Sequence, residues 1–178
     1  MTGHIHPDWT DVLDRRLPPV DTRPTPSEAS QLLRSLGIRL CCLDDTSRVL
    51  EPAPETYRTA EGILEAVATT NPGYQWDIVA NGLVNVFPVP SVLDEPVPPL
   101  TVAGTGLWRV LEEHVAIPRY KIQLFMEFRD DDGPPVPADL PAGSVRAALN
   151  TLIAPVAQTV WHVSGTPDAW FLTVSAIA

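Results

Sequence analysis

The sequence predicts an α+β protein made of two tandem modules, each a small sheet packed by two helices. Three observations lead to this prediction. Apolar residues recur at helical spacing in several segments, alternating or continuous apolar runs stand between these segments, and the second half repeats the element order of the first. The expected parts are an N-terminal extension with a short helix at 1–25, a first module at 26–88, a proline-rich connector at 89–99 and a second module at 100–178.

The first module begins with a capping box at Thr25 to Glu28, with proline at the first helical position. Gly37 ends this helix, and an apolar strand and a short second strand at Ser47 to Glu51 follow. Thr59 is the expected N-cap of a second helix, which ends at Asn71-Pro72-Gly73. Tyr74 to Val79 and Leu83 to Phe87 then form a hairpin around Asn81-Gly82, a pair that tolerates positive φ.

The second module repeats this order after five prolines between residues 88 and 99. Its strand Tyr120 to Phe128 is the longest alternating run in the chain: polar and apolar residues alternate along it, as in a half-buried strand. The predicted elements are, in order, a short strand at Leu100 to Ala103, a helix from Thr105, the strand Tyr120 to Phe128, a loop to Gly143, a helix that Ser144 caps, and a hairpin of Thr159 to Val163 with Trp170 to Val174.

The two halves align without a gap over their second helix and first hairpin strand. Thr59 and Ser144 are 144 minus 59, or 85, residues apart, and Trp76 and Trp161 are separated by the same 85. The helix caps and the strand tryptophans therefore correspond, which indicates an internal duplication. The tryptophans fill the core of each module or form a matched aromatic binding face.

Three segments of the first half also resemble a known family. They are Leu36-Gly37-Ile38, the stretch from Thr59 to Val67, and the stretch from Tyr74 to Val86. In pattern they are similar to the secretin and TonB short N-terminal domain, with Glu61 to Leu64 at the acidic helix start and Asn81-Gly82 in the closing hairpin. The resemblance covers residues 17 to 88, and residues 96 to 175 more loosely. It implies a small non-catalytic domain for protein binding or signalling. We expect a departure from the family, because the N-terminal residues lack the pattern of a secretory leader and the sequence shows no pattern of a barrel or secretin core.

The charge balance bears on the classes of partner. Twelve Lys and Arg stand against 22 Asp and Glu, a formal net charge of −10, and there is no basic run. Such a surface repels phosphates, so we expect no nucleic-acid partner and no binding to anionic membranes. No apolar run is long enough for membrane insertion. The near-exclusive use of arginine over lysine points to a bacterial or phage protein.

The adjacent Cys41 and Cys42 would point to opposite faces of a strand, so a bond between them would be strained. We expect free thiols and a cytoplasmic location, or a periplasmic one if a leader has been removed. The thiols lie in apolar surroundings, which argues against a nucleophile paired with His114 or His162. Ser164-Gly165 and Gly104-Thr105-Gly106 are too short for a nucleophile elbow or a phosphate loop.

Three clusters invite a metal interpretation. His4 and His6 with Asp8 lie near the chain start, where a solvated tail is the simpler interpretation. Glu112-Glu113-His114 lacks the second histidine of a zinc protease, and the consecutive aspartates of Asp130 to Gly133 do not converge as calcium ligands do. We therefore expect no metal ligands, no bound cofactor and no catalytic residues.

The function that we expect is non-enzymatic: a protein–protein interaction or assembly module, binding a protein partner or another copy. The expected surface is the strand Tyr120 to Phe128, where Phe125 would be exposed between Lys121 and Glu127. The alternative is a small-molecule-binding or hydrolytic protein with a site between the halves, bordered by residues 88–99 and 129–143.

Overall fold

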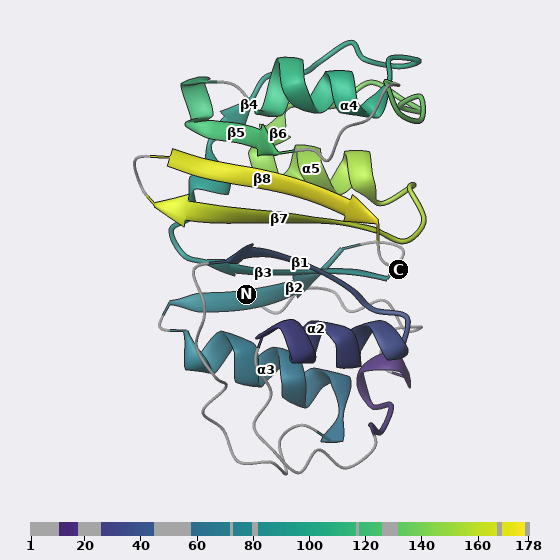
Figure 1. Ribbon diagram of the computed structural model, residues 1–178, viewed down its shortest axis with the longest axis vertical. Coiled ribbons are helices and arrows are strands. Elements are labelled where there is room, and N and C mark those ends of the chain that lie inside the picture. The colour runs from purple at the N-terminus through teal and green to yellow at the C-terminus, as the bar shows by residue number, and fades with distance from the viewer. Residues whose placement is uncertain are drawn as a thin grey trace. The chain divides into compact units, whose positions relative to one another are not determined.

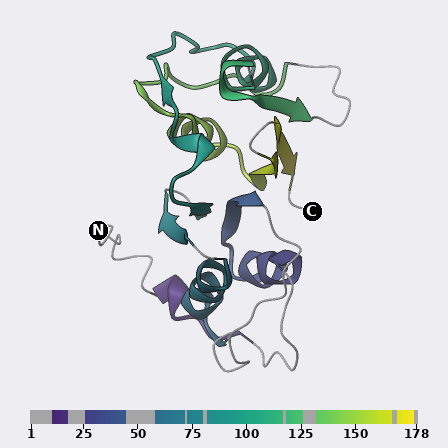
Figure 2. The ribbon, with the colours of Figure 1, turned by 90° about the vertical axis from the view of Figure 1, so that its left-hand side faces the viewer.

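The computed structural model describes residues 11–17, 26–44, 58–71, 73–79, 82–116, 118–125, 132–166 and 169–176. The chain is an α+β protein, as predicted, and divides into two compact units, Met1–Val89 and Pro90–Ala178. Figure 1 shows helices and a sheet in each unit, and Figure 2 shows several of these helices nearly end-on. The predicted strand Ser47 to Glu51, the cap residue Thr25 and the two N-terminal histidines lie outside the described residues.

The first unit has two helices on one face of three paired strands (Figure 1). The strand order is β2-β3-β1, with β1 parallel and β2 antiparallel to β3. Its core contains fully buried Leu33, Ile63 and Leu64 from the helices and Val84 from β3. The elements are α2 (Pro26–Ser35), β1 (Arg39–Asp44), α3 (Ala60–Thr70), β2 (Tyr74–Ile78) and β3 (Leu83–Pro88).

Local signals set the ends of α3. The amide of Gly62 donates to Oγ1 of Thr59 over 3.1 Å, which confirms the predicted N-cap. At the other end, Nδ2 of Asn71 donates to the Val67 carbonyl over 2.7 Å, and Gly73 adopts a φ of +84°. A side-chain cap and a left-handed glycine thus bound the helix as the sequence predicts.

The second unit places a longer set of elements around three paired strands of its own. The strand order is β7-β8-β5, with β5 parallel and β7 antiparallel to β8. A two-stranded sheet of β4 and β6 stands beside it. The elements are η2 (Val92–Asp94), β4 (Pro96–Val97), α4 (Leu107–Val110), the π-helical turn η3 (Leu111–Val115), η4 (Pro118–Tyr120), β5 (Ile122–Phe125), β6 (Gly143–Ser144), α5 (Val145–Ile153), β7 (Thr159–Thr166) and β8 (Ala169–Ala176).

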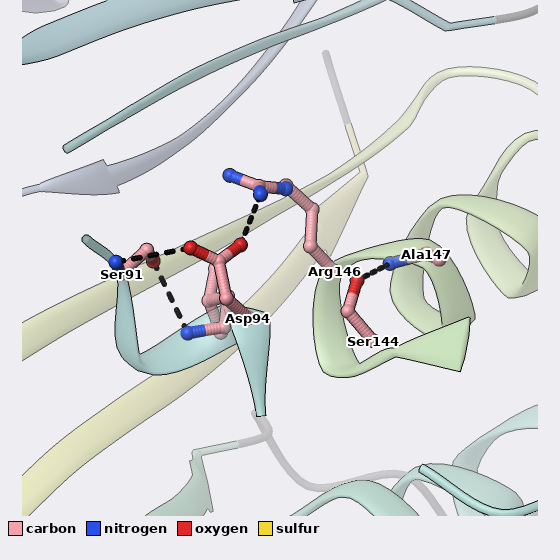
Figure 3. A network of polar contacts seen from close by, with 6 residues as sticks. Ser91, Asp94, Ser144, Arg146 and Ala147 are labelled. Atoms are coloured by element: carbon pink, nitrogen blue, oxygen red, sulfur yellow. Dashed lines mark hydrogen bonds and ion pairs between the residues drawn. The ribbon is translucent and has the colours of Figure 1, made fainter. Parts of the chain in front are cut away.

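The segment predicted as a connector packs within the second unit. Leu93 is fully buried, and a capping box closes η2, in which the Ser91 amide donates to Oδ2 of Asp94 over 3.1 Å. Figure 3 shows the same carboxylate in an ion pair with Arg146 of α5. Ser144 caps α5 by accepting a hydrogen bond from the Ala147 amide over 3.2 Å, as predicted. The boundary between the units lies at Val89–Pro90, so every residue of the expected connector except Val89 belongs to the second unit.

Two predicted strands of the second unit are wrong in extent. Leu100 forms an isolated bridge to Leu140, so Leu100 to Ala103 is not a strand. Tyr120 belongs to a 3-10 turn, and Lys121 has a φ of +55°, so β5 begins only at Ile122. A positive φ interrupts the extended backbone that side-chain alternation requires. The far end of the predicted strand, from Met126, lies outside the described residues.

The two units share their strand order and strand directions. In each, a first strand (β1 or β5) runs parallel to the last strand (β3 or β8), a capped helix follows it, and an antiparallel hairpin closes the unit. Trp76 and Trp161 lie on the first strand of their hairpins. Each indole donates from Nε1 to a residue 11 positions earlier, Trp76 to Glu65 and Trp161 to Asn150, both over 3.0 Å.

A further match lies before the first helix of each unit. Asp11–Leu13 is helical, Leu13 is buried, and Arg16 bridges to Thr59. In the second unit η2 contains buried Leu93, and Pro96 of β4 pairs with Ser144. The turns share the sequence Val-Leu-Asp, at 12–14 and 92–94. The expected extension and the expected connector therefore occupy matching positions in their units.

Candidate interaction surface

The start of β5 is held by contacts of the turn that precedes it. The hydroxyl of Tyr120 donates to the Pro96 carbonyl over 3.1 Å, and the amide of Trp170 donates to the Lys121 carbonyl over 2.9 Å. The Arg119 guanidinium carbon lies 5.6 Å from the centroid of the Tyr120 ring, a cation–π distance. These contacts place β5 in register with β8, with Ile122 opposite Trp170.

Alternate side chains of the second unit's sheet point away from its helices. Ile122 and Leu172 are at most 1% exposed, on the helix side, whereas Phe125 is 62% exposed and Phe171 is 43% exposed. Phe125 pairs with Thr173, and Phe171 with Gln123, so the two rings occupy diagonal positions on neighbouring strands. Diagonal neighbours in a sheet are within reach of aromatic side chains. We call the face of β5, β8 and β7 that carries both rings the open face.

Exposed large apolar side chains are few in the part of the chain that the structure describes. They are Val89, Phe125 and Phe171, and the two phenylalanines share the open face. Single exposed apolar residues are ordinary, but two aromatic rings side by side are the kind of patch that marks interaction sites. β5 is also an edge strand, since it pairs with β8 on one side and with no other described strand (Figure 1). An open edge adds unpaired backbone groups to this surface.

The structure therefore confirms that Phe125 is exposed, and Lys121 is exposed as well. Glu127, the third predicted residue, lies outside the described residues. Phe171 was not predicted. The alternation of Trp170, Leu172 and Val174 signals that Phe171 points the other way, but only the parallel pairing with β5 places it beside Phe125.

The residues that invited metal interpretations have other roles where they are described. Glu113 pairs with Arg109 over 2.9 Å on the π-helical turn. This hydrogen bond, together with the charges of Glu113 and Asp132, raises the pKa of Arg109. The carbonyl of Asp132 accepts from the Trp108 amide over 3.0 Å, so the loop caps α4 through its backbone. Within the described ranges, no three His, Cys, Asp or Glu residues form a group that could hold a metal.

Cys41 is a buried free thiol in β1. Burial lowers the pKa of the neighbouring Arg39. Of Cys42 the structure describes only the backbone. Ser164 lies within β7, and Gly104 adopts a φ of +79° in the turn before α4. Cys41 belongs to the first unit, and His114 and His162 belong to the second.

The second unit also has a groove of about 350 Å³. All of its lining side chains are apolar: Leu107, Val136, Leu152, Val156, Ala157 and four prolines. The volume falls in the range of small-molecule sites. Because no lining side chain is ionisable, the groove offers contact with an apolar group but no acid or base.

Comparison with protein-family models, with curated proteins and with solved structures gives no match. Every helix formed by the described residues is too short or too polar to cross a bilayer.

Proposed function

We propose that the chain is a non-enzymatic module for protein–protein interaction or assembly, and that the open face around Phe125 and Phe171 is its contact surface. One observation supports this most directly. Two of the three exposed large apolar side chains of the described residues lie on adjacent strands of a single sheet face. Burying two phenylalanine rings against a partner contributes a large share of the energy of a modest interface.

The proposal includes the architecture and the setting. The shared strand order, the matching caps and the paired indole contacts support two duplicated tandem modules. The resemblance of residues 17 to 88 to the secretin and TonB short N-terminal domain agrees with a binding role without catalysis. A buried free thiol at Cys41 agrees with a reducing cytoplasm.

Site-specific photocrosslinking in the cells that make the protein tests the proposal. Benzoylphenylalanine in place of exposed Gln123 on the open face should give protein adducts, and in place of exposed Glu112 on the π-helical turn it should not. Each adduct is identified by mass spectrometry and reconstituted from purified components. Adding Phe125→Glu to the Gln123 probe should abolish the adducts. If position 123 yields no more adduct than position 112, the open face is not a contact surface.

The apolar groove supports a second candidate, the binding of a small apolar molecule by the second unit. An environment-sensitive naphthalene-sulfonate dye should bind with enhanced fluorescence. Ala157→Trp should block this binding because it puts an indole at an exposed lining position. Unchanged dye fluorescence in this variant would rule the groove out.

A further inference from the structure

Each unit has a short segment that pairs with the cap of its long second helix, and we call this segment the strap. The straps are residues 11–17 in the first unit and 90–97 in the second. Each buries a leucine, Leu13 or Leu93, and three residues later an antiparallel bridge joins it to the capping residue of α3 or α5. Strap positions therefore correspond at a separation of 93 minus 13, or 80, residues.

Side chains from outside the second strap hold it to its unit. Arg146 of α5 forms an ion pair with Asp94, beside the capping box of η2 (Figure 3). The hydroxyl of Tyr120 donates to the Pro96 carbonyl over 3.1 Å. These partners lie 52 and 24 positions away along the chain, so both contacts fix the strap to the body of the unit.

The ion pair has no counterpart in the first unit. Asp14 stands where the second strap has Asp94. Glu61 stands where α5 has Arg146, because each lies two residues after the cap of its helix. Two carboxylates repel and cannot form an ion pair. A basic group at the position of Asp14 would instead pair with Glu61, which is exposed.

The hydroxyl contact has no counterpart either. Leu36 stands where the second unit has Tyr120, since each precedes a residue with a positive φ, Gly37 or Lys121. A leucine side chain has no donor for a strap carbonyl. The first strap is joined to its unit through buried leucines and through backbone pairing, in which the Leu17 amide donates to a carbonyl over 2.8 Å. It thus lacks both of the side-chain contacts that hold the second strap.

We propose that residues 11–17 are a displaceable strap. They detach while the rest of the first unit stays folded, and the apolar site of Leu13 and Leu17 then binds a partner segment with an apolar anchor and a basic residue in place of Asp14. Segments with few contacts open more readily than the core beside them. Glu61 and the net charge of −10 both favour a basic segment. This site belongs to the first unit and does not depend on the open face.

Native-state hydrogen exchange of the full chain, followed by NMR, tests detachment. The Leu17 amide should exchange at least about tenfold faster than the amides that pair β1 with β3, because the strap opens without the strands. Glu61→Arg should slow exchange at Leu17 by about two- to fivefold, since it supplies a partner for Asp14. Arg146→Glu is the matched variant of the second unit. It should speed exchange of the Val145 amide, which donates to a carbonyl of the second strap over 3.0 Å.

Fluorescence anisotropy with a labelled peptide tests binding at the vacated site. The probe has the sequence of residues 11–17 with Asp14→Arg, and the unaltered sequence is its control. The probe should bind the full chain about two- to fivefold more tightly than the control, and Glu61→Arg in the chain should reverse this order. Leu13→Ala in the chain should tighten probe binding at least about tenfold, because it weakens the strap that competes for the site. Circular dichroism shows whether each variant is folded.

Two results would overturn the inference. One is exchange at Leu17 with the rate and denaturant dependence of the β1–β3 amides, which would mean that the strap opens only when the whole unit unfolds. The other is a probe that binds folded Leu13→Ala chain no more tightly than wild type, or an order of peptide affinities that Glu61→Arg leaves unchanged. Crosslinking from position 123 reports on the second unit alone, so the proposed function stands or fails separately.

Discussion

One of the two indole hydrogen bonds is buried and the other is exposed. The same Trp→Phe substitution should therefore cost different amounts of unfolding free energy at the two positions. Trp161 is 0% exposed, and its Nε1 donates to Asn150, itself only 8% exposed. Trp161→Phe leaves the Asn150 oxygen without that donor, at about 1–3 kcal/mol, and the smaller ring leaves a cavity worth about 1 kcal/mol. The expected loss is therefore about 2–4 kcal/mol of unfolding free energy.

Trp76→Phe is the matched control. The indole of Trp76 donates to Glu65 at an exposed site, where water replaces the lost partner. We expect a cost below about 1 kcal/mol. In the Trp161→Phe background, Asn150→Leu should restore about 1 kcal/mol or more, because it removes the acceptor that was left buried.

The assay is guanidinium unfolding followed by far-ultraviolet circular dichroism, with a fit that allows two transitions because the chain has two compact units. Equal losses for Trp161→Phe and Trp76→Phe would refute the reasoning, since burial would then not control the cost. Failure of Asn150→Leu to restore stability would refute the unsatisfied-acceptor argument alone.

Two further changes test a buried polar side chain and a close approach of the backbone to a ring. Asn85→Val should raise the free energy of unfolding by about 1–2 kcal/mol. The reason is that both polar atoms of the fully buried Asn85 side chain lack a hydrogen-bond partner among the described residues. A lower free energy of unfolding in guanidinium would contradict this. Gly133→Ala should cost about 2–4 kcal/mol of unfolding free energy, since φ is +76° and a methyl group would lie 2.4 Å from the Trp108 ring. Gly104→Ala is the control: φ is +79° there, but the space around it is open, so the cost should be about 1 kcal/mol. Equal shifts of the thermal midpoint in the two variants would contradict the predicted clash.

The helices and hairpins were predictable because their signals are local. Thr59 and Ser144 cap helices through hydrogen bonds that span only three residues. Gly82 adopts a φ of +81° at the predicted hairpin turn. Interactions of this range depend on neighbouring residues alone, so a pattern of a few letters is enough to locate them.

The segments before each first helix were not predictable in the same way. Five prolines between residues 88 and 99 are typical of a linker, yet Leu93 and Val97 are buried in the second unit. The shared Val-Leu-Asp of the two turns was a usable signal, but three residues carry little weight alone. The role of the second of these segments depends on contacts with α5, more than 50 residues away, as the Asp94–Arg146 pair shows.

The sequence alone determined the α+β class, the caps at Thr59 and Ser144, the hairpins and the exposure of Phe125, because each depends on alternation or spacing within one segment. The helix expected from Thr105 instead begins at Leu107, after Gly106, which makes no side-chain cap. Tertiary structure decided where β5 begins, because a lysine in the sequence does not predict the positive φ that Lys121 adopts. It also brought Phe171 beside Phe125. Parallel strands are joined by long connections, so their register is set by packing of the whole unit and not by neighbouring residues.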